Sequence, residues 1–145
     1  MAGSKTNAFE NSIQLLIFQN TDIANIGDAA GLQNSATTGS LYVALYTTAP
    51  SDSTAGTEAN YTSYARVAVA RTSGGWTVTN NVVSNTAAIT FPACTGGSNT
   101  VVAFGILTAS SGGTLLYWGD LTANLAVSSG VTPEFAAGAL TISED

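Results

Sequence analysis

The sequence offers few side chains that could carry out nucleophilic catalysis. A reactive Ser or Cys usually needs a neighbouring base, most often His, and the 145 residues include no His. The one cysteine, Cys94, follows Pro92, and an unpartnered cysteine in such a place usually acts as a small hydrophobic residue. Lys5 stands alone near the N-terminus. We therefore predict no catalytic residues and no enzyme.

The carboxylates offer only weak alternatives. Glycoside hydrolysis needs two carboxylates at a set separation, and the nine of this chain are scattered. The spacing Asp52-x-Thr54-x-Gly56-x-Glu58 resembles the alternating ligands of a calcium loop, but calcium takes roughly six to eight oxygens. Zinc would need several Cys or His ligands. We interpret the 52–58 segment as a polar loop and predict no metal and no cofactor.

Glu58 and Arg66 form a candidate ion pair. Arg66 lies in a stretch of small residues, and a partly buried guanidinium needs a carboxylate to offset its loss of water. We predict a structural role for this pair.

The large aromatic residues allow two interpretations. Such residues on strands most often belong to the core, but they can also stack on a sugar. We predict that these four are core residues: Phe104, Tyr117, Trp118 and Trp76.

Charge is scarce throughout the chain. Charged residues make up 8% of it, and the net charge is −6, whereas an average soluble domain has about 25% charged residues. The three basic residues are too few to neutralise phosphates or an anionic membrane, so we predict no direct nucleic-acid or membrane partner. A neutral polar surface loses little on desolvation, which favours a surface covered by neighbours. The alternative is a secreted β domain with a neutral surface.

The first part of the chain predicts one amphipathic helix. Asn7 followed by Glu10 is typical of a helix N-cap, and hydrophobic residues then follow at helical spacing on one face. We predict a helix over about residues 8–19 and leave 21–32 open. The face expected to pack or dock consists of Phe9, Ile13, Leu16 and Ile17. Its longest apolar run, 15–18, is too short to cross a membrane, and no secretion signal is recognisable.

From residue 40 onward, the sequence consists of short stretches in which residue types alternate between two faces, separated by Gly-rich turns. This pattern indicates a mostly β fold, a jelly-roll-like β-sandwich. We predict a helix and linker over 1–39 and the sandwich over 40–145. Few charges protect the sheet edges, which favours edges that are used or hidden in an oligomer. The predicted strands are 41–47, 64–71, 76–79, 86–91, 101–107, 114–119, 125–127 and 139–143.

Several of these stretches, in order, resemble a family of small tailed-phage virion proteins described as head-decoration (cement), tail-fibre or virion structural proteins. The resemblance covers about 105 residues from Leu41 onward. It is carried by the following segments: Leu41–Asp52, Gly56–Glu58, Tyr64–Val69, Ala88–Pro92, Phe104–Ile106, Gly112–Gly119 and Phe135–Ile142.

The resemblance implies a virion component, made in the host bacterial cytoplasm, without known catalysis. Because the chain is compact and has no repetitive shaft, we predict a capsid decoration protein. Its expected partners are copies of itself, as a homotrimer, and the major capsid protein. Many modest interfaces of this kind would stabilise the head through multivalency. The alternative is a tail-associated fibre or adhesin module that binds host surface glycans, which exposed aromatic residues near the Asp52–Glu58 loop would favour.

Overall fold

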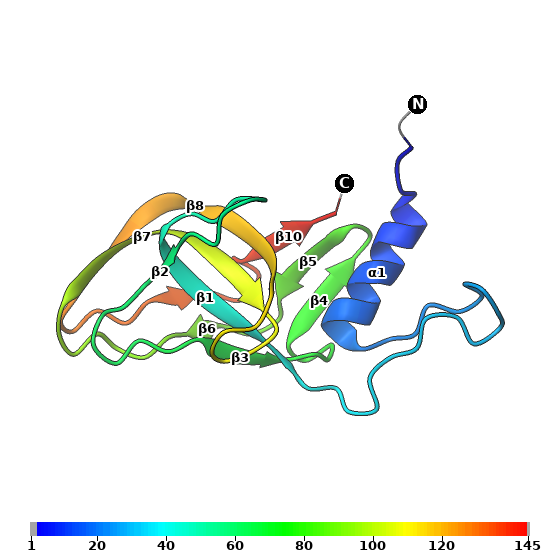
Figure 1. Ribbon diagram of the computed structural model, residues 1–145. Helices are drawn as coiled ribbons and strands as arrows, with labels where there is room; N and C mark the ends of the chain where they lie inside the picture. Colours follow the sequence, from blue (N-terminus) through cyan, green and yellow to red (C-terminus); the bar gives the residue numbers. More distant parts are fainter. Residues whose placement is uncertain (1–2, 145) are drawn as a thin grey trace. The chain divides into compact units, whose positions relative to one another are not determined.

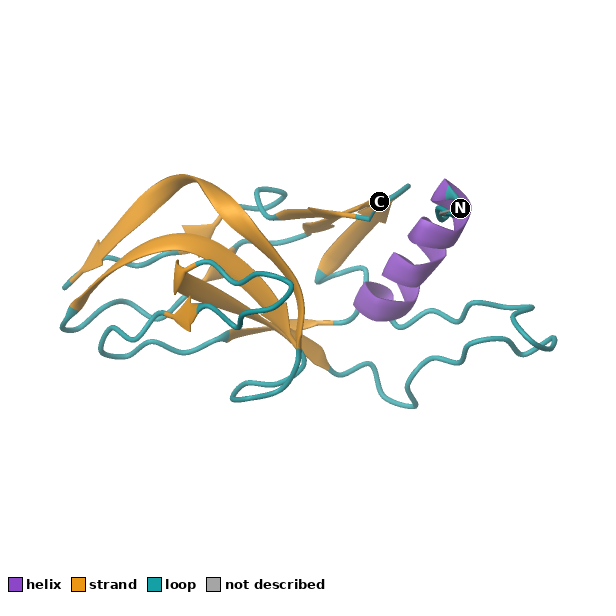
Figure 2. Ribbon diagram, turned by 45° about the horizontal axis from the view of Figure 1, so that its top comes forward, coloured by secondary structure: helices purple, strands orange, loops and turns teal. Residues whose placement is uncertain are grey.

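The computed structural model describes residues 3–144, and it is mostly β with one N-terminal helix (Figures 1 and 2). This confirms the predicted fold class. The elements are α1 (Asn7–Gln19), β1 (Ser40–Thr48), β2 (Thr57–Glu58), β3 (Val67–Ala70), β4 (Trp76–Thr79), β5 (Val82–Asn85), β6 (Ile89–Thr90), β7 (Ser98–Leu107), β8 (Leu115–Ser128), β9 (Glu134–Phe135) and β10 (Thr141–Ser143).

The chain forms two compact units, each built from separate segments. The first contains residues 1–40, 70–88 and 136–145, and the second contains 41–69 and 89–135. Residues 70–88 and 136–145, assigned by the sequence to the sandwich, therefore belong with the helix.

In the first unit, α1 lies against β4 and β5 of the three-stranded antiparallel sheet β10-β5-β4 (Figure 1). Phe18 meets Trp76 edge-to-face with ring centroids 5.0 Å apart, and both side chains are fully buried. Gln14 is also buried and donates from its amide to the Asn81 carbonyl at 2.8 Å. The helix is thus an integral part of this unit's core.

The helix begins one residue earlier than predicted. Thr6, not Asn7, is the N-cap, and its hydroxyl accepts from the Phe9 N–H at 3.3 Å. The predicted cap was wrong because Thr6 also has a hydroxyl suited to this position. At the other end, Asn20 adopts a left-handed conformation with φ 55°.

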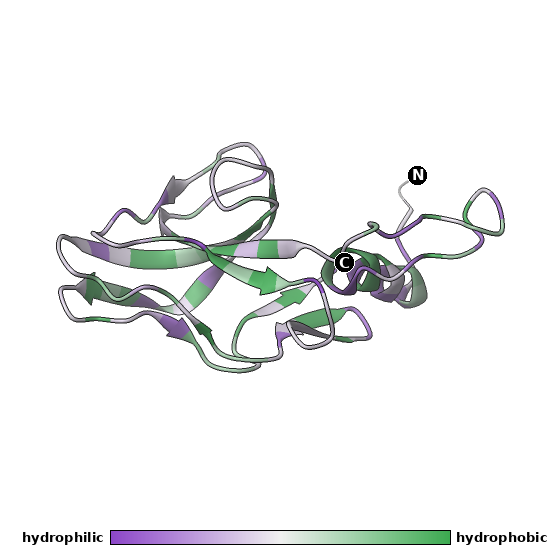
Figure 3. Ribbon diagram, turned by 90° about the horizontal axis from the view of Figure 1, so that it is seen from below, coloured by the Kyte–Doolittle hydropathy of each residue, from purple (hydrophilic) through white to green (hydrophobic). Residues whose placement is uncertain are grey.

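The second unit contains the longer sheet, in which β2, β1, β7 and β8 are neighbours and β3 also pairs with β1. The β1–β7 and β7–β8 pairs are antiparallel. Half-buried and exposed residues alternate along β8 from Leu115 to Thr122, whereas residues 43–46 of β1 and 103–107 of β7 are buried without interruption, as expected for inner strands covered on both faces. Hydrophobic residues are accordingly prominent in the strands (Figure 3). The ladder between β7 and β8 is interrupted between Val101 and Ala103, and β8 is an edge of the sheet.

A second, two-stranded layer of this unit pairs β6 with β9. Phe135 of β9 meets Phe104 of β7 edge-to-face at 5.8 Å and Phe91 at 6.2 Å. Tyr64 stacks on Phe91 at 6.5 Å. These aromatic contacts join the two sheets in a sandwich-like arrangement.

Most predicted strands overlap observed ones, but their bounds differ. The segments 114–119 and 125–127 form one strand, β8, and 64–71 shortens to β3. The short strands β2, β5 and β9 were not predicted. Two-residue strands have no detectable periodicity, and β5 lacks strict alternation.

Candidate ligand-binding groove

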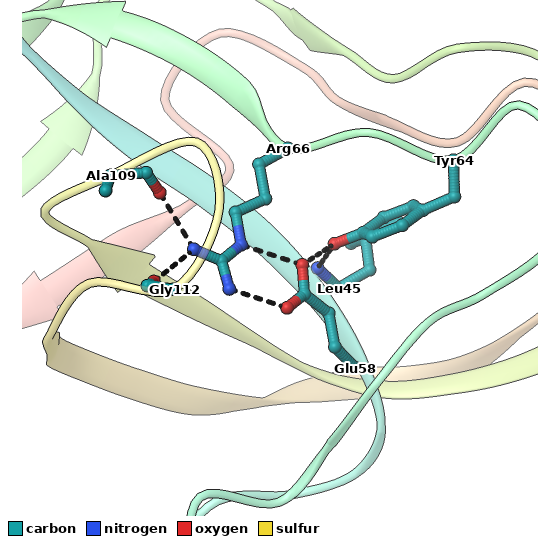
Figure 4. A network of polar contacts seen from close by, with 6 residues as sticks. All are labelled: Leu45, Glu58, Tyr64, Arg66, Ala109 and Gly112. Carbon is teal, nitrogen blue, oxygen red and sulfur yellow. Dashed lines mark hydrogen bonds and ion pairs between the residues drawn. The ribbon is translucent and has the colours of Figure 1, made fainter.

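The structure brings Glu58 and Arg66 together in a two-pronged ion pair (Figure 4). The guanidinium donates from Nε to Oε1 and from Nη2 to Oε2, both at 2.8 Å. Tyr64 donates from its hydroxyl to Glu58 Oε1 at 2.7 Å and accepts from the Leu45 N–H at 3.0 Å. Parallel charge-assisted hydrogen bonds of this kind are among the strongest in proteins.

The network changes the acidity of its members. Burial raises the pKa of the Glu58 carboxyl, but the hydrogen bonds from Arg66 and Tyr64 and the charge of Arg66 outweigh burial, so its pKa lies below the ordinary value. Burial is the largest cause of the pKa of Tyr64 being raised well above the ordinary value. The ionised carboxylate and the neutral phenol are therefore the favoured forms.

Arg66 also holds the turn between β7 and β8. Its Nη1 donates to the Ala109 carbonyl at 2.8 Å and to the Gly112 carbonyl at 2.7 Å (Figure 4). Glu58, on the other side of the pair, lies in β2 at the end of the loop that follows β1. One ion pair thus connects the β1–β2 loop with the β7–β8 turn.

The β1–β2 loop and the first residues of β8 border an open surface groove of about 380 Å³. Trp118 is 40% exposed and lines it from β8, so the prediction that Trp118 is a core residue was wrong. Side chains of an edge strand can remain accessible to solvent. The alternating pattern of the sequence alone could not reveal that this strand lies at the edge of the sheet. The lining residues are Ser51, Asp52, Ser53, Thr54, Ala55, Leu115, Leu116 and Trp118.

The groove loop has a fixed conformation at its two ends. Ser51 and Thr54 exchange backbone hydrogen bonds at 3.0 and 3.3 Å, and their hydroxyls lie 2.8 Å apart. Gly56 has φ +68°, and a Cβ there would lie 2.5 Å from the Thr48 carbonyl oxygen. Only glycine fits such a backbone without displacing it.

The other predicted aromatic core residues differ in exposure. Trp76 is fully buried in the first unit and Phe104 is 7% exposed in the second, while Tyr117 is half-buried. Trp118 is therefore the member of the set that is most available to a ligand.

In the Asp52–Glu58 loop, the carboxylate of Glu58 is already bound by donors of the protein. Both carboxylate oxygens of Glu58 already accept from Arg66, and one also accepts from Tyr64. Across residues 3–144, no three His, Cys, Asp or Glu side chains gather closely enough to hold a metal ion.

The helix residues predicted as an interface are only partly available. Phe9 is 38% exposed, and Ile13, Leu16 and Ile17 are half-buried. The buried helix face instead consists of Glu10, Gln14 and Phe18. A docking role for the predicted face stays a prediction. None of the helices in the described part of the chain is long and apolar enough to span a membrane.

Two structural side chains were not predicted from the sequence. Arg71 donates to the Leu16 and Ile17 carbonyls at 2.6 Å each, and its positive charge stabilises the C-terminal end of α1. Asn85 is 1% exposed and binds the Ala87 and Ala136 carbonyls. Neither follows a local pattern, because the Arg71 partners and Ala136 lie more than 50 residues away in the sequence. Arg71 alone could have been suspected, as one of three basic residues.

The fold and the groove define a small, mostly β protein with a ligand-sized depression beside an exposed tryptophan. The family described as podophage GP4 fiber I protein gp80 matches residues 20–143. The chain belongs to this family, and it is a phage virion structural protein. The match confirms the resemblance seen in the sequence, and it begins after α1. No curated protein matches the chain significantly.

Proposed function

We propose that the chain is a non-enzymatic subunit of a phage tail fibre that binds a glycan of the host surface. The observation that carries the proposal is Trp118, which is 40% exposed beside the Asp52 loop. An exposed indole offers a rigid apolar face on which a sugar ring can stack, and neighbouring hydroxyl and carboxylate oxygens can accept its hydroxyl protons.

Binding is favoured over hydrolysis by the composition of the groove. Asp52 is the one carboxylate among the described lining residues, whereas hydrolysis ordinarily uses a pair. The second carboxylate of the loop, Glu58, is held by Arg66 and Tyr64.

The family description supports a fibre more than a head decoration protein, because it names a fibre. Contact with the major capsid protein and a trimeric state remain predictions. The location is tested by gold-labelled antibody against this chain on purified particles. Label on the tail supports the fibre proposal, and label confined to the head contradicts it.

Glycan binding is tested by the fluorescence of the protein itself. The chain contains two tryptophans, and Trp76 is fully buried, so a ligand in the groove changes mainly the emission of Trp118. Purified host surface polysaccharide should shift this emission and reduce its quenching by acrylamide.

Variants then assign the effect to the groove, with binding measured by isothermal titration calorimetry because they lack the reporter indole. Trp118→Ala should weaken binding at least about tenfold, the loss expected when one well-used aromatic contact is removed. Trp118→Phe should retain part of the affinity because it keeps an aromatic face. Equal binding by Trp118→Ala and the wild type would refute the assignment.

A further inference from the structure

The groove is lined by a single charged side chain. Asp52 is the one ionisable side chain among the residues described as lining it, and the others are Ser, Thr, Ala, Leu and Trp. The groove therefore presents hydroxyl groups, an apolar face and one negative charge.

Arg66 is the basic residue of the second unit, which also contains the groove, and its guanidinium nitrogens already have partners within the protein. Its side chain is 10% exposed, and its three nitrogens make four hydrogen bonds of 2.7–2.8 Å to Glu58, Ala109 and Gly112. Turning it toward a ligand would leave the Glu58 carboxylate and two carbonyl groups without their donor, which costs more than a new surface contact contributes.

The remaining two basic residues belong to the first unit and also have partners. Arg71 donates to the carbonyls of Leu16, Ile17 and Thr38 and to the Ser35 hydroxyl. Lys5 pairs with Glu144 at 3.1 Å. Since the chain has three basic residues in total and no His, every cationic side chain has an internal partner.

We infer that the groove selects uncharged saccharides and discriminates against those that carry carboxylate, sulfate or phosphate groups. This inference rests on the proposed function. An acidic sugar would bring a negative charge toward Asp52 with no cationic side chain to neutralise it. The hydroxyls of a neutral sugar can donate to the same carboxylate, and its apolar face can stack on Trp118.

The discrimination should be large enough to measure. Two like charges about 5 Å apart on a wet surface repel by roughly 1–2 kcal/mol, which corresponds to about tenfold in affinity. Because the groove is open, dissolved salt screens this repulsion, and the ratio should shrink at about 0.5 M salt. The stacking contribution of Trp118 should depend much less on salt.

The test uses the whole chain and paired oligosaccharides of equal length. Each pair consists of a neutral hexose oligomer and its uronic-acid counterpart, made from glucose, galactose or mannose, so that its members differ only at C6. Isothermal titration calorimetry measures both affinities, in the wild type and in variants that lack Trp118. We expect the neutral member of a bound pair to bind about tenfold more tightly.

Substitutions at Asp52 separate charge from shape. Asp52→Asn should reduce the preference for the neutral member, and Asp52→Lys should reverse it. Asp28→Asn makes the same change of net charge in the other unit and should leave the preference unchanged. Its side chain accepts from two backbone N–H groups, which an Asn oxygen can still do.

The outcomes distinguish the two levels of the hypothesis. Equal or tighter binding of the acidic member, lost in Trp118→Ala, overturns the charge selection and leaves glycan binding intact. A preference that Asp52→Lys does not alter also overturns it. If neither the paired oligomers nor host polysaccharide binds, the proposed function fails and the inference fails with it.

Discussion

Replacing Arg66 by Met is the most informative perturbation of the structure. The substitution keeps most of the apolar stem and removes the four hydrogen bonds of the guanidinium. It leaves Glu58, whose side chain is 27% exposed, as a partly buried carboxylate with one remaining side-chain donor, Tyr64.

The size of the effect follows from these contacts. Breaking a fully buried pair by removing one partner costs about 3–5 kcal/mol, and partial exposure of Glu58 lets water recover some of this. We therefore expect a loss of about 2–4 kcal/mol in the free energy of unfolding. In a domain of this size, that loss corresponds to a fall in Tm of about 5–15 °C.

The assay is thermal and urea unfolding of the wild type, Arg66→Met, Glu58→Gln and the double variant. The double variant should be more stable than the sum of the two single losses predicts, by about 1–3 kcal/mol, because each single change already breaks the pair. Arg66→Lys should fall between the wild type and Arg66→Met, since an ammonium lacks the planar fork.

The control is Lys5→Met, which removes the same charge from a pair whose lysine side chain is 34% exposed, more than the 10% of Arg66, and should change stability by less than about 1 kcal/mol. The pKa of Glu58 is lowered from 4.5 in the folded chain, so the contribution of its ionised form is present above pH 4.5 and lost as the pH falls through the folded pKa. The cost of Arg66→Met should therefore shrink in acid. A Tm for Arg66→Met within 1 °C of the wild type, about the precision of the measurement, would refute this reasoning.

Five further substitutions test the same network and other parts of the fold. Tyr64→Phe should lower the free energy of unfolding by about 1–2 kcal/mol. Because the pKa of Tyr64 is raised from 10.0 in the folded chain, the wild type should lose stability above pH 10 and the variant should lose less. Unfolding measured as a function of pH checks this. Arg71→Met should cost about 1–3 kcal/mol in urea and loosen amide exchange in the last turn of α1. Gly56→Ala should cost at least about 1–3 kcal/mol through its left-handed backbone and weaken glycan binding, whereas an unchanged Tm would contradict the close approach to the Thr48 carbonyl. Phe18→Ala should lower the free energy of unfolding by about 3–5 kcal/mol, and Phe9→Ser by about 0.5 kcal/mol or less. Since Phe9→Ser leaves the fold intact, a loss of self-association in this variant would assign docking to the exposed face of the helix.

The sequence predicts those secondary-structure elements that are long enough to show a repeating pattern of hydrophobic residues. The helix and the strands β1 and β7 could be predicted because each spans enough residues for a repeat to appear. The division of the chain into units could not, because the pairing of β10 with β5 joins residues about 60 positions apart, and no local pattern encodes such a pairing.

The candidate site was only partly predictable for a similar reason. The partnership of Glu58 and Arg66 could be proposed because a cation among small residues needs a counter-charge. The exposure of Trp118 could not, since the sequence alone does not show that β8 lies at the edge of the sheet with an uncovered face. The second role of Arg66, binding the Ala109 and Gly112 carbonyls, depends on a turn more than 40 residues away.

Every basic side chain has a partner within the fold, and this affects how the protein can associate with copies of itself. The surface left to a partner is made mainly of Ser, Thr, Asn, Gly and apolar residues, whose desolvation costs less than that of Lys or Glu. The long edge strand β8 carries no Lys or Arg, and Asp120 is its single charge that would oppose pairing with a second copy. We therefore expect a homo-oligomer, predicted as a trimer, whose stability depends little on salt. Light scattering with size-exclusion chromatography at low and high salt checks this, and a monomer at micromolar concentration under both conditions contradicts it.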